Sequence, residues 1–340
     1  MLVIRMAQSD DIDDISRLAE TSGGSLTNLP DDKDILSKKL NRVQQALALT
    51  THQQALFWFV LEDTHTGQLV GVSGIEAAIG LDQANYTYRV GTIVHASSEL
   101  NIYHRFPTLF LTNDHTGCSE LCSLYLHPDY RHSKAGALLS KSRFLFIAQH
   151  RHLFAEKLIA ELRGFIDEQG GSPFWEGLGR HFFDMDFSQA DYLSAVKDKQ
   201  FIAELMPRYP FYTNFLPQSA QDVIGAVHKD TLPAKSLLEH EGFRYEGYVD
   251  IFDAGPTLEC YMDRVRAIRD SYCASQLQVE ALSGYPMLVS NRQLDQFRCA
   301  LLWPEPSACH ETDVAKLWGL LHLNEADKAR CVSLERMVQE

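Results

Sequence analysis

Apolar residues along this chain follow two different spacings, and this predicts an α/β fold. A short apolar run at Leu2–Met6 has the length of a strand. The next two segments carry apolar residues three or four positions apart, as one face of a helix requires: Ile12, Ile15 and Leu18, then Ile35, Leu36, Leu40, Val43 and Leu47. Phe57–Leu61 and Leu69–Ile75 predict a hairpin that turns at Asp63–Gly67. The opening order is therefore strand, helix, helix, strand, strand.

The stretch Ser119–His150 is predicted to form the centre of the fold. Its apolar run Leu121–Leu126 is typical of a buried strand, which ends at His127-Pro128 because proline cannot extend a hydrogen-bonded ladder. A helix is predicted to begin near Gly136 after a short polar loop. A helix that follows a strand so closely offers amide donors and partial positive charge to a phosphate. The same pattern also fits an ordinary strand–loop–helix unit of an α/β core.

Composition and charge narrow the range of functions. The chain has 340 residues, of which 45% are hydrophobic, so it can form two domains or one large one. Its formal net charge of −14 argues against nucleic acid as a partner and mildly favours a cationic substrate. No apolar run reaches the ~18 residues of a membrane span, and the residues after Met1 lack the apolar region of a signal peptide. We therefore expect no membrane partner.

The cysteines indicate a reducing compartment. There are seven, an odd number without a regular framework, so we expect free thiols and a cytoplasmic protein. Cys118 and Cys122 lie four positions apart, but no second cysteine pair completes a zinc site. We therefore expect no bound metal.

The sequence changes character beyond Arg269. Leu288–Asn291 and Phe297–Trp303 are typical of short strands with turns between them. We therefore predict an α/β domain at residues 1–270 and a small β-rich C-terminal domain at residues 271–340. We expect the second domain to have a structural or oligomer-forming role.

The loop after the central strand resembles a known phosphate-binding loop. Arg131-His132-Ser133-Lys134-Ala135-Gly136 is similar to the Arg-x-x-Gly-x-Gly loop of the GNAT superfamily of N-acyltransferases, whose fold begins with the same order of elements. The resemblance implies an elaborated GNAT-like α/β fold with a mixed central sheet, in which the amides of this loop hold the pyrophosphate of an acyl-CoA. It assigns cofactor binding to Arg131, Lys134, Ala135, Gly136 and Ala137, and an amide for the tetrahedral oxyanion to Leu124. Lys134 replaces the first glycine of the motif; a lysine resists a positive φ, although its ammonium could reach a phosphate.

Several longer segments are similar to the arginine N-succinyltransferase family. The similarity covers about residues 1–271 and is carried by Arg89–Thr92, Val94–Ser97, Pro107–Leu111, Asn113–Gly117, Ala160–Gly164, Ser172–Trp175, Phe201–Pro207 and Ile251–Cys260. It implies transfer of succinyl from succinyl-CoA to the α-amino group of L-arginine, in arginine catabolism, by a chain that could work in a homo- or hetero-oligomer. Two other interpretations stay open: a GNAT enzyme for another amine, such as ornithine, and a non-catalytic subunit that binds a partner chain.

The late helix of GNAT enzymes usually supplies a tyrosine that protonates the departing thiolate, and this chain lacks it. Trp175 and Leu238 occupy the tyrosine position in the two segments that resemble this helix, and neither side chain is an acid. The resemblance assigns the role to His228, because a histidine can donate a proton and recover it near neutral pH. His95 and His115 are the main rivals.

The acceptor pocket is predicted just before the central strand. The resemblance places substrate binding at Asn113, Asp114 and His115. A guanidinium pairs best with a carboxylate, so Asp114 is the expected partner of the arginine side chain, with Glu120 as the rival. The succinyl carboxylate needs a cation, for which Arg89 and Arg163 are both candidates.

Overall fold

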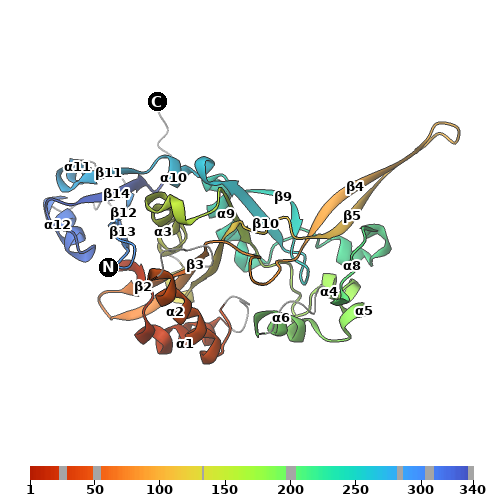
Figure 1. The fold of residues 1–340 in the computed structure, drawn as a ribbon, viewed down its shortest axis with the longest axis horizontal. Coiled ribbons are helices and arrows are strands. Elements are labelled where there is room, and N and C mark those ends of the chain that lie inside the picture. Colours follow the sequence, from red (N-terminus) through yellow and green to blue (C-terminus); the bar gives the residue numbers. More distant parts are fainter. Residues whose placement is uncertain are drawn as a thin grey trace.

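The structure is a computed structural model that describes residues 1–22, 29–48, 55–131, 134–196, 204–281, 286–302 and 310–335. Within these ranges, fourteen strands form one mixed sheet in the order β11-β14-β12-β13-β1-β2-β3-β6-β7-β10-β9-β4-β5-β8 (Figure 1). Helices α1 and α2 lie together at one side of the central strands, and α3 lies at the other. The predicted α/β class with a mixed central sheet is confirmed.

The strands and helices have the following bounds. The strands are β1 Leu2–Met6, β2 Leu56–Asp63, β3 Gln68–Glu76, β4 Thr87–Ser97, β5 Ile102–Thr112, β6 Ser119–Leu126, β7 Lys157–Glu161, β8 Phe211–Tyr212, β9 Arg244–Val249, β10 Pro256–Tyr261, β11 Tyr272–Ser275, β12 Met287–Ser290, β13 Arg298–Leu302 and β14 Lys328–Ser333. The helices are α1 Ile12–Thr21, α2 Lys33–Ala48, α3 Ala135–Gln149, α4 Pro173–Gly177, α5 Arg180–Phe183, α6 Phe187–Val196, α8 Gln218–Gln221, α9 Leu232–Glu241, α10 Arg266–Arg269, α11 Gln276–Ala281 and α12 His310–Leu320.

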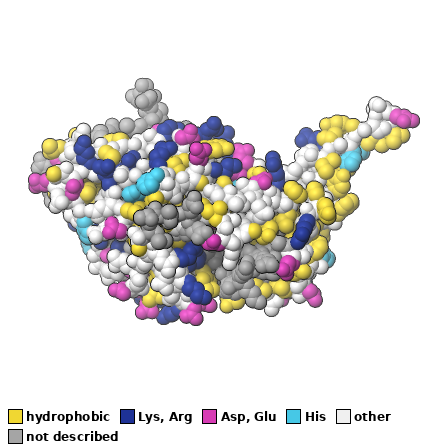
Figure 2. Space-filling model, viewed as in Figure 1, with side chains coloured by type: hydrophobic (Ala, Val, Ile, Leu, Met, Phe, Trp, Pro, Cys, Tyr) yellow, Lys and Arg dark blue, Asp and Glu magenta, His cyan; other side chains and the backbone are white. Residues whose placement is uncertain are grey.

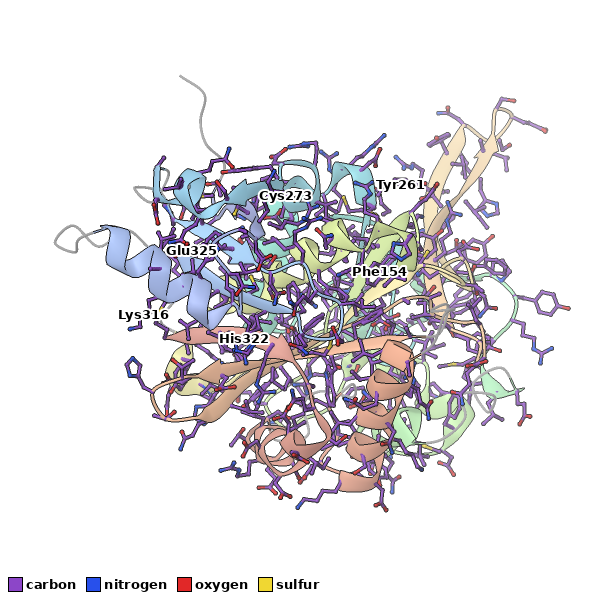
Figure 3. The ribbon with its side chains drawn as sticks, turned by 60° about the vertical axis from the view of Figure 1, so that its left-hand side comes forward. Phe154, Tyr261, Cys273, Lys316, His322 and Glu325 are labelled. Atoms are coloured by element: carbon purple, nitrogen blue, oxygen red, sulfur yellow. The ribbon has the colours of Figure 1, made fainter. Side chains whose placement is uncertain are left out.

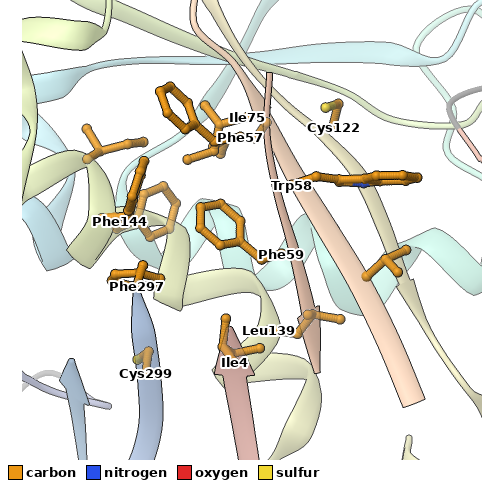
Figure 4. Packing of buried hydrophobic residues seen from close by; sticks show 14 of the residues in the cluster. Ile4, Phe57, Trp58, Phe59, Ile75, Cys122, Leu139, Phe144, Phe297 and Cys299 are labelled. Atoms are coloured by element: carbon orange, nitrogen blue, oxygen red, sulfur yellow. The ribbon is translucent and has the colours of Figure 1, made fainter. Parts of the chain in front are cut away.

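Helix α3 is the buried centre of the molecule. Its residues are apolar or buried on nearly every side, which is the pattern of a helix enclosed by other elements. Phe146 packs against Phe57 and Phe59 of β2, with ring centroids 5.0 and 5.1 Å apart, and against Phe297 at 5.1 Å. Figure 4 shows this packing around Phe144 and Leu139 of α3. Each fully buried aromatic ring stabilises the fold by roughly 1.5–3 kcal/mol, so this cluster fixes α3 against the sheet.

A buried ion cluster joins α3 to α9 and α10. The Glu241 carboxylate lies 2.9 Å from the Lys141 ammonium and 2.7 Å from the Arg266 guanidinium, and it also accepts the amide N–H of Ala267 at 2.8 Å. Lys141 donates in addition to the carbonyl of Leu334, and Arg266 donates to that of Ser333. These contacts attach the C-terminal segment to the central helix.

The C-terminal segment continues the main sheet. Strand β13 pairs with β1, with Val3 opposite Ala300, so β11–β14 share one sheet with the strands that precede them. The segment also has an apolar cluster of its own, in which Trp318 and Leu317 of α12 pack near Cys331. Strands β12 and β13 fall where the sequence predicted them, except that Trp303 lies outside the described residues. The boundary at residue 270 stays a prediction.

Strands β4 and β5 form a long hairpin that projects from the body, and we call residues 90–109 the arm (Figure 1). Both of its faces carry exposed apolar side chains. Val94 and Tyr103 are 47% and 66% exposed on one face, and Ile93 and Ile102 are 38% and 40% exposed on the other. Figure 2 shows the hydrophobic side chains along the arm. An isolated hairpin is at best marginally stable in water. We therefore expect another protein surface to cover the apolar side chains of the arm.

Candidate active site

Strands β6 and β7 separate at the centre of the sheet. They run parallel and pair at only two positions, Ser119 with Leu158 and Glu120 with Ile159. Strand β6 also breaks its pairing with β3, where the register shifts between Val72 and Gly74. A gap between two parallel strands at the middle of a sheet gives a ligand access to backbone amides that a continuous ladder would use.

The break in β6 is centred on Ser123. This residue has a φ of +53°, an uncommon conformation for a non-glycine residue, and strain of this kind is concentrated at functional sites. Leu124 follows it, and neither residue appears in the registers that join β6 to β3 and β7 in the described chain. The predicted oxyanion amide therefore lies next to an irregular strand position. Sequence reasoning missed Ser123, because a serine carries no signal for a positive φ.

The predicted phosphate loop leads directly into α3. Lys134 precedes the helix with a φ of −75°, so the lysine at this position causes no backbone strain, and the expected conflict with a positive φ does not arise. Its ammonium lies 3.5 Å from Glu335. The first helical bond of α3 runs from the Leu138 amide to the Lys134 carbonyl, so the amides of Gly136 and Ala137 precede it at the helix N-terminus. His132 and Ser133 lie outside the described residues.

Arg131 and Ala135 bound this loop. The Arg131 guanidinium donates to the Leu126 carbonyl at 3.0 Å and lies 5.8 Å from the centre of the Tyr125 ring. Ala135 is buried at the first position of α3. The loop is therefore fixed to the end of β6 by a side chain that the sequence assigned to the cofactor.

His228 lies beside the end of β7. Its backbone amide donates to the Arg163 carbonyl at 2.9 Å, and Val227 forms a bridge with Gly164. The Nδ1 atom accepts the amide N–H of Asp230 at 3.2 Å, so Nε2 is the nitrogen that remains for a substrate. Partial burial lowers the pKa of the His228 imidazole below its usual 6.5, and the nearby Arg163 cation lowers it further. His228 is therefore mostly neutral at pH 7.

Asp114 lies at the surface between two strands. Its carboxylate accepts the Tyr248 hydroxyl of β9 at 2.8 Å and lies 3.9 Å from the Arg89 guanidinium of β4. Hydrogen bonds from Thr112 and Tyr248 lower the pKa of this carboxyl, so it is ionised at neutral pH. Asp114 can thus present a negative charge, and Arg89 already lies beside it.

Asn113 and His115 flank Asp114 but point to different surroundings. The Asn113 side chain is exposed and donates to the Asn85 carbonyl. The His115 side chain is only 1% exposed, and its ring lies 4.5 Å from the Tyr248 ring. Of the three predicted acceptor residues, His115 is therefore the buried one, while its neighbours reach the surface.

Glu259 organises the buried side of this group, and sequence reasoning missed it. Its carboxylate contacts His115 Nε2 and Lys157 Nζ, each at 2.8 Å. Burial raises the pKa of Glu259, but the two hydrogen bonds outweigh this effect and the pKa is lowered. The sequence feature that could have pointed to Glu259 is a charged residue within the mostly buried strand β10. The contacts link β7, β9 and β10 to the segment before β6.

Two surface hollows lie near these elements. One, of about 500 Å³, is lined by residues of α1 and β3 and by His127, Asp129 and Tyr130, and so borders the predicted phosphate loop. The other, of about 490 Å³, is lined by Phe154 and Tyr261 among others (Figure 3). The second hollow contains none of the predicted site residues. Its position alone assigns it no role.

None of the described helices combines the length and the apolar composition of a membrane span. The histidine, cysteine, aspartate and glutamate side chains of the described residues form no group of three or more that could hold a metal ion.

The order of the central elements, the separated pair β6–β7 and the irregular β6 agree with the N-acyltransferase fold of GNAT type that the sequence resemblance implied. A family described as arginine N-succinyltransferase beta subunit matches residues 2–267. The chain belongs to this arginine N-succinyltransferase family.

Individual relatives extend the match over the whole chain. A protein named arginine N-succinyltransferase from Enterobacter sp. (strain 638) is 51% identical over 338 residues, and one from Shigella dysenteriae serotype 1 (strain Sd197) is 49% identical over 342 residues; each match covers 98% of both chains. The solved structure of arginine/ornithine succinyltransferase subunit AI from Pseudomonas aeruginosa is similar with a TM-score of 0.87, 35% identity and 99% coverage of both chains.

Proposed function

We propose that this chain transfers the succinyl group of succinyl-CoA to the α-amino group of L-arginine. The observation that carries the proposal is the arrangement around the β6–β7 gap: the irregular Ser123–Leu124 segment, the N-terminus of α3 after β6, and His228 beside the end of β7. These supply an oxyanion amide, a phosphate site and a proton carrier in one region. The family relationship supports the choice of acyl donor and acceptor. The experiment is L-arginine-dependent release of CoA thiol from succinyl-CoA.

The proposed reaction needs one proton carrier. The neutral α-amine attacks the thioester carbonyl, and the Leu124 amide donates to the oxyanion that forms. The new C–N bond then replaces the C–S bond as the tetrahedral intermediate collapses. His228, mostly neutral at pH 7, first accepts the proton that the amine nitrogen loses and then gives it to the departing thiolate. The imidazole therefore acts as a base and an acid within one turnover.

We expect Asp114 to hold the arginine guanidinium, and Asp114→Asn tests this. The amide oxygen of the asparagine can still accept the Tyr248 hydroxyl, so the substitution removes the charge while keeping the shape. A charge-assisted bond contributes roughly 1.5–3 kcal/mol, or about 10- to 100-fold in kcat/KM for arginine, and the exposure of Asp114 favours the lower end. Ornithine, with its shorter ammonium side chain, should lose less. Equal losses for both amines, or none for arginine, would count against Asp114.

We also propose that the chain assembles with a second copy through the arm. The arm exposes apolar side chains on both faces. A row of contacting rings runs from its base toward its tip: Phe215, Tyr212, Phe106 and His95. The arm contains one arginine, Arg105, and one glutamate, Glu99, so its net charge is zero, whereas the whole chain carries −14. An uncharged, apolar projection on an acidic chain can pack against an identical neighbour without the repulsion that two acidic surfaces would meet.

The double variant Val94→Asp/Tyr103→Asp tests the assembly. Both side chains lie on the same face of the arm, so two carboxylates there should prevent close packing and yield a single-chain particle. Mass measured by light scattering during size-exclusion chromatography gives the result. Leu277→Asp is the control, because Leu277 is 76% exposed on α11, in the C-terminal segment. A wild-type protein that is already a single chain, or a double variant that stays assembled, would contradict the proposal.

The reducing cytoplasm is the proposed location. The six cysteines that the structure describes are free thiols, and five of them are buried. Such thiols are typical of proteins that function where disulfides do not persist.

A further inference from the structure

Arg143 is a buried cation without an acidic partner in the described chain. Its side chain is 1% exposed, near the middle of α3. Its guanidinium donates to the Ser140 carbonyl at 3.0 Å, the Ser140 hydroxyl at 3.2 Å and the Gly74 carbonyl at 3.4 Å. All three acceptors are neutral. Burial lowers the pKa of Arg143 to about 10, so the group keeps its charge at neutral pH.

A guanidinium of this kind has unused donors. It carries five N–H groups, and the contacts above use three of them. Burying a cation without a counter-ion costs free energy. An anion that binds beside the cation and pairs with it would reduce this cost. The remaining two N–H groups match the two oxygens of a carboxylate.

Arg143 also lies next to the position at which the pairing of β3 with β6 is irregular. The Gly74 carbonyl that it contacts belongs to β3 at the register shift, and Gly74 pairs with Cys122 of β6. Leu124, the proposed oxyanion amide, is two residues beyond Cys122. The Arg143 guanidinium therefore contacts β3 at the same strand irregularity that contains the proposed oxyanion amide.

Ser73 is a second buried polar group on the α3 side of the sheet. Ser73 precedes Gly74 and is fully buried, and its hydroxyl has no hydrogen-bond partner among the residues that the structure describes. Ser73 is opposite Phe59 in the sheet, and Phe59 packs against Phe146 of α3, so Ser73 faces α3 as well. Thr87, Thr257 and Ser290 also carry buried hydroxyls without a partner among the described residues, but Ser73 is the one beside Gly74, where a ligand oxygen could pair with it.

We propose that Arg143, assisted by Ser73, binds the carboxylate at the end of the succinyl group and so selects a dicarboxylic acyl-CoA. The proposal rests on the proposed function and adds the residue that chooses the acyl donor. Arg143 thereby takes the place of Arg89 and Arg163, the two arginines suggested from the sequence as partners of the succinyl carboxylate. Arg89 lies near the Asp114 carboxylate at the surface, and Arg163 lies beside His228.

Succinyl-CoA and butyryl-CoA provide the test, because their acyl chains have the same number of carbons and only succinyl carries the carboxylate. For Arg143→Met we expect kcat/KM with succinyl-CoA to fall about 100-fold or more, since a bidentate charge-assisted pair is lost. The value with butyryl-CoA should stay within a few-fold of the wild type or rise. Arg143→Lys should lie between them, because an ammonium keeps the charge without the fork. Arg163→Gln is the matched control and should not change the ratio of the two donors.

Three results would overturn the proposal. Equal losses of both donors in Arg143→Met would indicate a role in shaping β6 instead, and a changed donor ratio in Arg163→Gln would move the carboxylate site there. If Arg143→Met fails to fold, the unfolding temperature of the wild-type protein is measured with each donor instead. Succinyl-CoA should raise this temperature more than butyryl-CoA does, and equal shifts would contradict the assignment. A wild-type protein without arginine-dependent turnover of any acyl-CoA would instead contradict the proposed function.

Discussion

His228→Ala is expected to lower kcat by about 10²- to 10⁴-fold while both Michaelis constants change little. The imidazole carries the proton from the attacking amine to the departing thiolate, and removing a positioned acid–base group costs rates of this order. The side chain contributes to proton transfer and not to binding, so the loss should appear in turnover. Steady-state kinetics with succinyl-CoA and L-arginine measure it.

The pH dependence gives an independent check on His228. Burial and the Arg163 cation lower its pKa, so the imidazole is neutral and able to accept a proton above that value and protonated below it. Activity should therefore persist as the pH falls through 6.5 and decline only at more acidic pH. This acidic limb should disappear in His228→Ala.

His127 offers a matched control. Like His228, it precedes a 3₁₀ turn, and its Nδ1 accepts the amide N–H of the aspartate two residues later, at 3.4 Å in His127 and 3.2 Å in His228. His127→Ala should therefore reproduce any loss of stability that comes from removing the cap, without the loss of turnover. Near-normal kcat for His228→Ala across neutral pH would exclude His228, and His95 would then be the next candidate.

Gly136→Val is expected to weaken succinyl-CoA binding by about 100-fold and to leave arginine affinity close to normal. The amides at the N-terminus of α3 are proposed to hold the pyrophosphate, and a branched side chain there obstructs its approach. The folded protein itself tolerates a side chain at this position, since a Cβ on Gly136 would lie 3.8 Å from Leu126, an ordinary contact. The loss should therefore reflect the ligand. Isothermal titration calorimetry with succinyl-CoA and free CoA measures it.

Gly136→Ala distinguishes the effect of side-chain bulk from the effect of losing the backbone freedom of glycine. Alanine removes the freedom of glycine but adds little bulk, so it should bind CoA better than the valine variant does. An unchanged CoA affinity in Gly136→Val would place the pyrophosphate elsewhere.

Local patterns in the sequence were sufficient to predict the central elements. The run Leu121–Leu126, the proline after it and the polar loop before Gly136 depend only on neighbouring residues, and β6 and α3 appear where these patterns placed them. The opening strand Leu2–Met6 was predicted for the same reason. The roles of His228, Leu124 and the phosphate loop came from the resemblance to a family and remain predictions.

Contacts between distant parts of the chain could not be predicted. Glu259 lies 144 residues from His115, and no periodicity relates the two. The unpaired charge of Arg143 becomes visible only when its neighbours are known, because in the sequence it is one basic residue of a helix. The continuation of the sheet into β13 likewise depends on pairing with β1, which the pattern of the C-terminal strands does not contain.

The most direct test of the account is to identify the product that forms from succinyl-CoA and L-arginine. The purified wild-type chain should release CoA thiol only when arginine is present, and NMR of the product should show one succinyl group on the α-nitrogen with the guanidinium unmodified. Ornithine in parallel should react more slowly. Absence of arginine-dependent thiol release, or a succinyl group on another nitrogen, would contradict the account.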